Sequence, residues 1–205
     1  MIGCFNMAND KKERMKKIRD EILSFSLSSL YNDRVQNKMF PVIGEGNHNA
    51  NILFIGEAPG KNEAMTGKPF CGRSGKVLDD LLEYIGIQRS DVYITNIVKD
   101  RPPENRDPTP EEIELYAPFL DRQIDIIQPK IIATLGRFSM VYIMKKFGLE
   151  RELLPISAIH GRVFETSASF GKLKIIPLYH PAVAVYDSNK LNDLKKDFDI
   201  LKQSI

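Results

Sequence analysis

The sequence predicts an α/β protein, a three-layer αβα sandwich around a central four-stranded parallel sheet. Short apolar runs alternate along the chain with longer segments whose apolar residues recur at helical spacing. The short runs are apolar throughout, which is typical of parallel strands that helices cover on both faces. The expected strands are 51–56, 91–98, 129–136 and 172–181, with a further one in 161–166.

Five helices are expected around these strands. They span 10–28, 75–87, 109–127, 137–147 and 189–203. Thr109 and Pro110 mark the start of the third helix, as an N-cap followed by proline at the first helical position. The segments 29–51 and 56–75 are expected to be irregular. No internal repeat or linker interrupts the pattern, so we expect residues 1–205 to form a single domain with an N-terminal helical extension at about 10–28.

The composition is that of an ordinary globular protein. Hydrophobic residues make up 42% and charged residues 27%, and the net charge of +2 argues neither for nor against nucleic acid. No apolar run approaches the roughly 20 residues that span a bilayer, and the N-terminus lacks the apolar core of a secretory signal. We therefore expect a cytoplasmic monomer without membrane contacts. Cys4 and Cys71 are too few for a four-ligand metal site, so no metal or cofactor is expected.

Glycine and polar residues follow the expected strands at four places. Because parallel strands end at one edge of a sheet, these residues are expected to meet in one cleft. They are 56–60, Asn96, Gly136 and 179–181.

The first of these segments does not form a phosphate-binding loop. Only three residues separate Gly56 from Gly60, and Asn62 stands where such a loop places the hydroxyl that holds Mg²⁺. Pro59 also removes one backbone N–H donor. A dinucleotide-binding GxGxxG fingerprint is absent as well, so the loop is expected to wall some other pocket.

Four side chains near the expected cleft carry usable chemistry, and each also has a purely structural interpretation. Glu57 positions water or stabilises a cation, or is a solvated loop acid. Phe70 is a stacking platform for a flat ligand, or folds back on the core. Asn96 pairs with the edge of a base, or forms a turn. His180 holds the strand-end position of a catalytic residue, although a lone histidine is more often structural.

Six motifs in a fixed order resemble family 4 of the uracil-DNA glycosylase superfamily over about residues 26–200. They are GEAPG, TGKPFCGRSGKVLDDLL, VYITNIVK, RPPENRDPTPEE, QIDIIQPKIIATLG and YHPA. The resemblance implies the uracil-DNA glycosylase fold and hydrolysis of the N-glycosidic bond of deoxyuridine in DNA, the first step of base excision repair. The target base must leave the stack to be reached. Uracil-containing DNA, single- or double-stranded, is then the expected partner.

The resemblance also implies roles for individual residues. Phe70 would stack on the flipped uracil, Asn96 would bond its edge, and His180 would donate to O2 as negative charge develops. Glu63 would lie beside C5 and exclude the thymine methyl. Gly56 and the backbone around Glu57 and Ala58 would close the pocket, and Glu57 and Asn105 are the candidates for assisting water. The expected DNA contacts are Lys61, Lys68, Arg73, Lys76, Lys99, Arg101, Pro181 and Ala182.

The sequence departs from the family at one place. Family 4 holds a [4Fe–4S] cluster on four cysteines, whereas this chain has Ser26, Ser29, Asp100 and Tyr116 at those positions. Oxygen ligands do not hold this cluster, so we expect a network among these four residues to replace it. Two alternatives to the glycosylase remain: a catalytically weak protein that binds DNA or a base, and a glycosylase for another deaminated base such as hypoxanthine.

Overall fold

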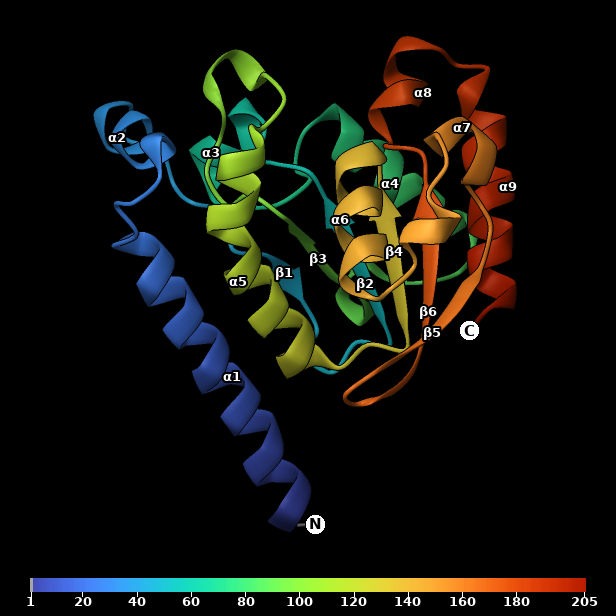
Figure 1. The fold of residues 1–205 in the computed structure, drawn as a ribbon, viewed down its shortest axis with the longest axis horizontal. Coiled ribbons are helices and arrows are strands. Elements are labelled where there is room, and N and C mark those ends of the chain that lie inside the picture. Colours follow the sequence, from blue (N-terminus) through green and yellow to red (C-terminus); the bar gives the residue numbers. More distant parts are fainter. Residues whose placement is uncertain (1) are drawn as a thin grey trace.

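A computed structural model describes the backbone of residues 2–205 and the side chains from residue 10 onward, so Cys4 lies outside the described side chains. In this range six strands form one sheet in the order β1-β3-β2-β4-β6-β5 (Figure 1). The strands are β1 (Glu45–Gly46), β2 (Ile52–Gly56), β3 (Tyr93–Asn96), β4 (Ile131–Leu135), β5 (Phe164–Ala168) and β6 (Gly171–Leu178). The four central strands pair in parallel, and the two edge strands pair antiparallel.

The predicted αβα sandwich with four parallel strands is confirmed, and the two antiparallel edge strands extend it. The helices are α1 (Ile2–Leu23), α2 (Ser29–Gln36), α3 (Lys61–Thr66), α4 (Arg73–Tyr84), α5 (Pro110–Ile127), α6 (Arg137–Lys146), α7 (Ile156–Ile159), α8 (Ala182–Tyr186) and α9 (Lys190–Gln203). Single 3₁₀ turns span Arg89–Asp91, Pro103–Asn105 and Glu150–Glu152.

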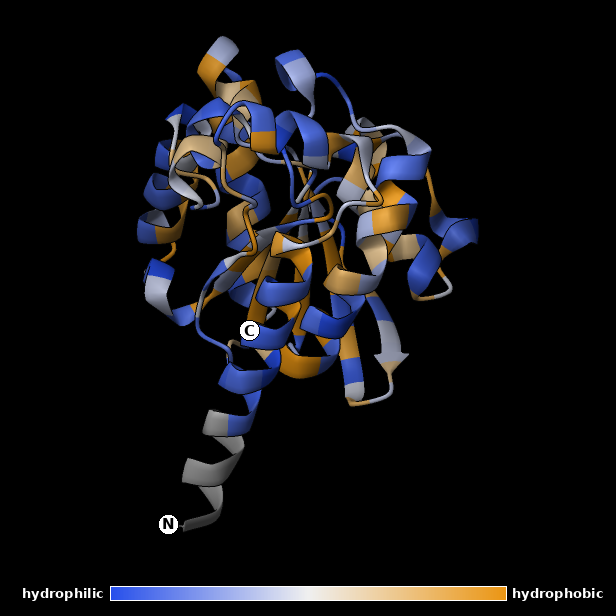
Figure 2. Cartoon of the chain, turned by 90° about the vertical axis from the view of Figure 1, so that its left-hand side faces the viewer, coloured by the Kyte–Doolittle hydropathy of each residue, from blue (hydrophilic) through white to orange (hydrophobic). Residues whose placement is uncertain are grey.

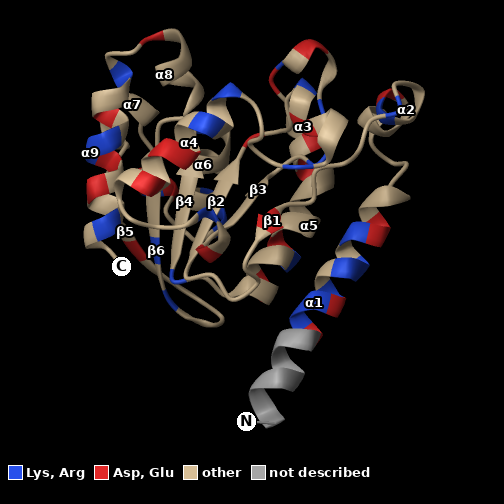
Figure 3. Cartoon of the chain, turned by 180° about the vertical axis from the view of Figure 1, so that it is seen from behind, with Lys and Arg blue, Asp and Glu red and all other residues tan. Residues whose placement is uncertain are grey.

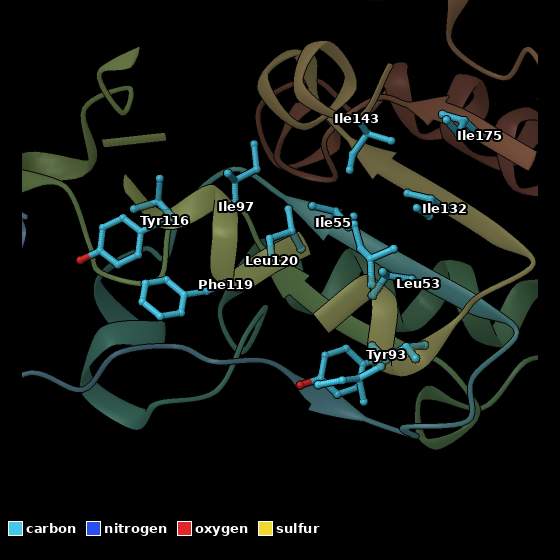
Figure 4. Packing of buried hydrophobic residues seen from close by; sticks show 14 of the residues in the cluster. Leu53, Ile55, Tyr93, Ile97, Tyr116, Phe119, Leu120, Ile132, Ile143 and Ile175 are labelled. Carbon is cyan, nitrogen blue, oxygen red and sulfur yellow. The ribbon is translucent and has the colours of Figure 1, made fainter. Parts of the chain in front are cut away.

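Alternate residues of the central strands pack into two separate hydrophobic cores, one on each face of the sheet. Leu53 and Ile55 of β2 face α5 and α6, as Figure 4 shows, whereas Ile52 and Phe54 face α4 and α9. Figure 2 shows the strands as the most hydrophobic part of the chain, with polar residues on the outer helix faces. This period of two along strands buried on both faces explains why the runs read as continuously apolar.

The long N-terminal helix α1 packs against α5 outside the sheet layers (Figure 1). Its described apolar contacts come from Met15, Ile18 and Ile22, while charges of both signs are interspersed along the helix from residue 10 onward, as they are along α9 (Figure 3). The helix ends at Leu23, not at residue 28 as predicted, because the Arg34 guanidinium donates to the carbonyls of Ile22 and Leu23 at 3.2 and 2.7 Å.

Two helices lie in segments predicted to be irregular, namely α2 and α3. The Ser28 hydroxyl caps α2 by accepting from the Leu30 N–H at 3.2 Å. The predicted start of α5 is confirmed: Thr109 accepts the Glu112 N–H, and the Glu112 carboxylate accepts the Thr109 N–H. None of the described helices is both long and apolar enough to cross a membrane.

Candidate active site

A pocket of about 320 Å³ opens where the parallel strands end, at the edge of the sheet near α8 in Figure 1. Ligands of such sheets bind at this edge because the strand-end loops converge there. The pocket is lined by Glu57, Ala58, Pro59, Gly60, Glu63, Phe70, Ser74, Asn96, Pro102, Asn105, Arg106, His180 and Ala182. Segments more than a hundred residues apart in the sequence therefore supply one site, which includes all the proposed catalytic and uracil-binding residues except Gly56.

Gly56, the last residue of β2, leaves room for two of the predicted site residues. A Cβ on Gly56 would lie 2.3 Å from Asn96 Oδ1 and 2.8 Å from Phe70 Cζ, so only glycine fits at this position. The Phe70 ring is 7% exposed and lies 5.5 Å from the His180 ring, with 31° between their planes. An apolar aromatic face, an amide and an imidazole thus border the same space.

Asn96 is the most unusual polar residue of the pocket. It is 2% exposed, yet its side-chain amide makes no hydrogen bond with any other described residue. Among the described side chains, the one hydrogen bond to Asn96 reaches its backbone oxygen, which accepts from Lys99 Nζ at 2.7 Å. An amide that lines a pocket with its donor and acceptor unused is suited to a ligand that offers the matching pair.

His180 is held as one neutral tautomer. Burial lowers the pKa of the imidazole to about 4, although the nearby Glu63 carboxylate opposes this shift. Its Nδ1 accepts the backbone N–H of Ala182 at 3.1 Å, so the ring proton resides on Nε2. The histidine therefore enters chemistry near neutral pH as an uncharged N–H donor.

Glu57 directly follows β2 and lies partly buried at the pocket wall. Burial raises its pKa to about 7; Asp107 adds to the shift and Arg137 opposes it. Arg137 and Asp107 are themselves an ion pair beside the site. A carboxyl group that titrates near neutral pH is suited to take a proton from water.

Asn105 lines the pocket from the 3₁₀ turn after β3, and both it and Glu104 have left-handed backbone angles, with φ of 54° and 53°. Its Oδ1 accepts from Arg101 Nε at 2.7 Å, which leaves the amide nitrogen for the pocket. Asn105 thus offers its amide nitrogen as a donor, and the carboxylate of Glu57 is the stronger acceptor for the proton of water.

Arg106 also lines the pocket, although no motif predicted a role for it. Its guanidinium forms two hydrogen bonds with Glu112, at 2.6 and 2.8 Å, and so ties the wall to the start of α5. The signal was its place in RPPENRDP, directly after Asn105. Ser74 and Pro102 also line the pocket without having been proposed.

The proposed DNA contacts divide into two groups. Lys61, Lys68, Arg73 and Lys76 are exposed, and Arg101 is partly exposed. Lys61 and Arg73 directly adjoin Gly60 and Ser74, which line the pocket. Lys76 pairs with Asp80 at 2.7 Å on the surface of α4. Pro181 is buried beside the pocket, and Ala182 lines it at the start of α8.

The prediction that Lys99 contacts DNA is wrong. Its side chain is fully buried, and its Nζ donates to Thr95 Oγ1, the Asn96 carbonyl and Gln123 Oε1 at 2.8, 2.7 and 2.6 Å. Burial lowers the pKa of this amine well below its ordinary value. The place of Lys99 shortly after β3 is compatible with an exposed side chain. The side chain is buried because α5, which carries Gln123, covers it.

The positions of the family's cluster cysteines hold a different arrangement. Asp100 and Tyr116 are buried, and Tyr116 donates to Asp100 Oδ2 at 2.5 Å, so these two residues form part of the predicted network. Arg34 completes the group by donating to both Asp100 oxygens at 3.0 and 3.1 Å. The prediction is wrong for Ser26 and Ser29, which are exposed and line a surface hollow.

This donor set does not fit a [4Fe–4S] cluster, because it offers a guanidinium, a phenol and a carboxylate that already bond one another and no thiolate. Cys71 is exposed beside the Phe70 turn, far along the chain from these positions. Among the described side chains, no three His, Cys, Asp or Glu groups gather as a metal site requires.

Comparison with known proteins identifies the family. The profile of the Uracil DNA glycosylase superfamily matches residues 43–202. The chain is 42% identical over 192 residues to a type-4 uracil-DNA glycosylase of Sulfurisphaera tokodaii, covering 93% of this chain and 84% of that one. The chain is 43% identical to the type-4 enzyme of Archaeoglobus fulgidus, over 87% of this chain and 89% of that one. It is 46% identical to the type-4 enzyme of Saccharolobus solfataricus, over 80% of this chain and 76% of that one. These matches confirm the resemblance carried by the motifs, and the chain belongs to the uracil DNA glycosylase superfamily, alongside its type-4 members.

Proposed function

We propose that this protein is a uracil-DNA glycosylase that releases uracil from deoxyuridine in DNA and leaves an abasic site. The observation that carries the proposal is the Asn96 amide, which lines the pocket and bonds no other described residue. Its donor and acceptor are open to the pocket, where the edge of a base that offers the matching pair can bond both.

The pocket recognises uracil by its face and its edge. The Phe70 ring supplies the flat apolar surface on which a flipped base stacks, at an energy of about 1–3 kcal/mol. The Asn96 amide then donates to the O4 oxygen of uracil and accepts its N3–H, two bonds that need a donor and an acceptor side by side. Together these contacts offset the few kcal/mol required to take the base from the stack.

His180 stabilises the departing base. When the C1′–N1 bond breaks, the bonding electrons stay with uracil, and negative charge spreads to its O2 oxygen. The Nε2–H of neutral His180 donates to O2 as this charge grows, an interaction stronger in the transition state than in the ground state. Because the imidazole stays neutral, it keeps its own proton.

Glu57 assists the attacking water. The sugar left behind carries cationic character at C1′, and water adds to this carbon with loss of one proton. The Glu57 carboxylate accepts that proton and also stabilises the cation. The departing uracil anion takes up one proton at N1 from solvent, and Glu57 returns to solvent the proton that it took from water. The products are therefore uracil and the abasic sugar, and no other reactant is needed.

The exposed basic residues around the pocket hold the DNA strand. The exposed side chains of Lys61, Lys68 and Arg73 meet phosphates in this proposal, while α8, which begins at Ala182, presses into the gap left by the flipped base. Phosphate contacts of this kind give salt-dependent affinity without sequence preference, which suits an enzyme that must search any sequence for one base.

The direct test is an abasic-site cleavage assay on single- and double-stranded oligonucleotides that carry one deoxyuridine. The proposal predicts strand scission after alkali for the wild type and its loss in His180→Ala. Correctly folded wild-type protein that binds the oligonucleotide but leaves it intact would contradict the proposal. Parallel substrates with hypoxanthine or xanthine would then decide whether another base is released.

A further inference from the structure

The Phe70 loop, residues 69–72, forms the stacking wall of the pocket, yet its backbone conformation is an unfavourable one. Phe70 has φ of 47°, in the left-handed region that aromatic residues seldom occupy. Such a conformation persists only where the surroundings fix it. The position of the Phe70 ring therefore depends on whatever holds this loop.

Glu63 of α3 supplies the hold on the C-terminal side of the loop. One carboxylate oxygen, Oε1, accepts both the Cys71 N–H and the Gly72 N–H at 3.0 Å. Gly72 is also the N-cap of α4 and has no side chain with which to cap that helix. The Glu63 carboxylate thus binds the N–H of the N-cap residue and of the residue before it, at the end of α4 where the helix dipole favours a negative group.

The loop is fixed on two further sides. Arg89 donates from Nη2 to the Pro69 carbonyl at 2.7 Å, and from Nη1 to Asp79 at 2.8 Å. Beneath the loop, a Cβ on Gly75 would lie 1.8 Å from the Phe70 carbonyl oxygen, so α4 packs directly against the backbone there. Glu63 is the one of these three contacts that also lines the pocket.

We propose that Glu63 is a positioning residue that clamps the Phe70 loop and so sets the stacking wall for the base. The inference rests on the proposed function and replaces the expectation that Glu63 serves to exclude the thymine methyl. That expectation needs the carboxylate as a bulky neighbour of C5, whereas the clamp needs only an oxygen that accepts two N–H groups. The two roles predict different consequences of removing the carboxylate: loss of the bulk would admit thymine, whereas loss of the acceptor would loosen the loop.

The test compares Glu63→Ala with Glu63→Gln, because glutamine keeps an acceptor oxygen at the same reach. In Glu63→Ala, amide hydrogen exchange of Cys71 and Gly72 should speed up about tenfold, the effect of losing one net hydrogen bond. KM for a deoxyuridine oligonucleotide should rise by a similar factor, with a smaller change in kcat. Glu63→Gln should stay close to wild type in both measurements, and neither variant should release thymine.

Arg89→Met is the matched control, since Arg89 lies outside the pocket and cannot contact a base. Loosening the loop from that side should raise KM as Glu63→Ala does. Release of thymine by Glu63→Ala with an unchanged KM for uracil would overturn the clamp, and so would unchanged exchange at Cys71 and Gly72. The exchange measurement uses the protein without DNA. It therefore still decides the clamp if the wild type releases no uracil and the proposed function fails.

Discussion

Glu57→Gln should make the protein more stable and less active, and the gain in stability should depend on pH. Burial raises the pKa of Glu57 in the folded protein to about 7 from an ordinary value of 4.5. The carboxyl is protonated in both folded and unfolded states below pH 4.5, so it costs nothing there. Between pH 4.5 and 7 only the unfolded chain ionises freely, and the folded state loses stability as pH rises.

The size of this effect follows from the two pKa values. A shift from 4.5 to about 7 sets an upper limit of about 3 kcal/mol on the cost of ionising Glu57 in the folded protein. The side chain is only partly buried, and solvent screening reduces the cost to about 1–2 kcal/mol. Glutamine keeps the shape without the charge, so above pH 7 the variant should exceed the wild type in stability by this amount.

Urea denaturation of both proteins at pH 4.5 and at pH 8 measures the difference. The unfolding free energies should agree at the lower pH and differ by about 1–2 kcal/mol at the higher. Glu83→Gln, an exposed substitution on α4, serves as the control and should show no such gap. Equal stability of Glu57→Gln and wild type at pH 8 would refute the argument that the pocket desolvates this carboxyl.

The same variant should change the pH profile of uracil release. Wild-type kcat/KM should fall as pH drops through about 7, where Glu57 becomes protonated. His180 cannot cause this decline, because its pKa of about 4 keeps it neutral throughout. Glu57→Gln should be slower and should lack the decline near pH 7. A profile that keeps it would assign the proton transfer to another group.

Three further substitutions separate function from stability. Asn96→Leu keeps the branching of the side chain but removes its polar edge. It should lower kcat/KM by about 30- to 1,000-fold through two lost hydrogen bonds, while urea denaturation shows stability equal to wild type or better. A less stable variant with normal activity would contradict the inference that the Asn96 amide bonds the base and no protein group. Lys99→Met should lower stability by about 1–3 kcal/mol in urea denaturation, because three oxygens lose their donor. The salt dependence of DNA binding should stay unchanged; a weaker salt dependence would show that Lys99 contacts phosphates after all. Arg34→Met should lower the free energy of unfolding by about 3–5 kcal/mol, because Asp100 stays buried without its charged partner. The exposed control Arg19→Met should change it little. Recovery of stability on adding iron and sulfide would contradict the inference that the Arg34–Asp100–Tyr116 group replaces the cluster.

The central architecture was predictable because its signals are local. Each buried parallel strand is a short apolar run, and the capping residues Thr109 and Glu112 mark the start of α5 within four positions of sequence. The edge strand β1 is only two residues long, Glu45 and Gly46, and both are exposed. No hydrophobic pattern therefore predicts it. The short helix α3 lies among glycines, and its Glu63 contacts become visible only in three dimensions.

The site was predictable as a set of residues but not as a set of contacts. Position after a strand brought Glu57, Asn96 and His180 to one pocket, since parallel strands end together. The same rule failed for Lys99, because whether a residue after a strand faces solvent depends on which helix covers it. Arg34 was missed because its partner Asp100 lies 66 positions away in sequence.

The most direct test of the account is uracil release by protein that has been stripped of iron with a chelator. The substrate is a labelled single-stranded oligonucleotide with one deoxyuridine, and iron content is measured on the same sample. The account predicts multiple turnovers at undiminished rate, with His180→Ala inactive, because the pocket and the Arg34–Asp100–Tyr116 group are complete without a cluster. Activity that appears only after iron and sulfide are supplied would contradict it, as would a stripped wild type no faster than His180→Ala.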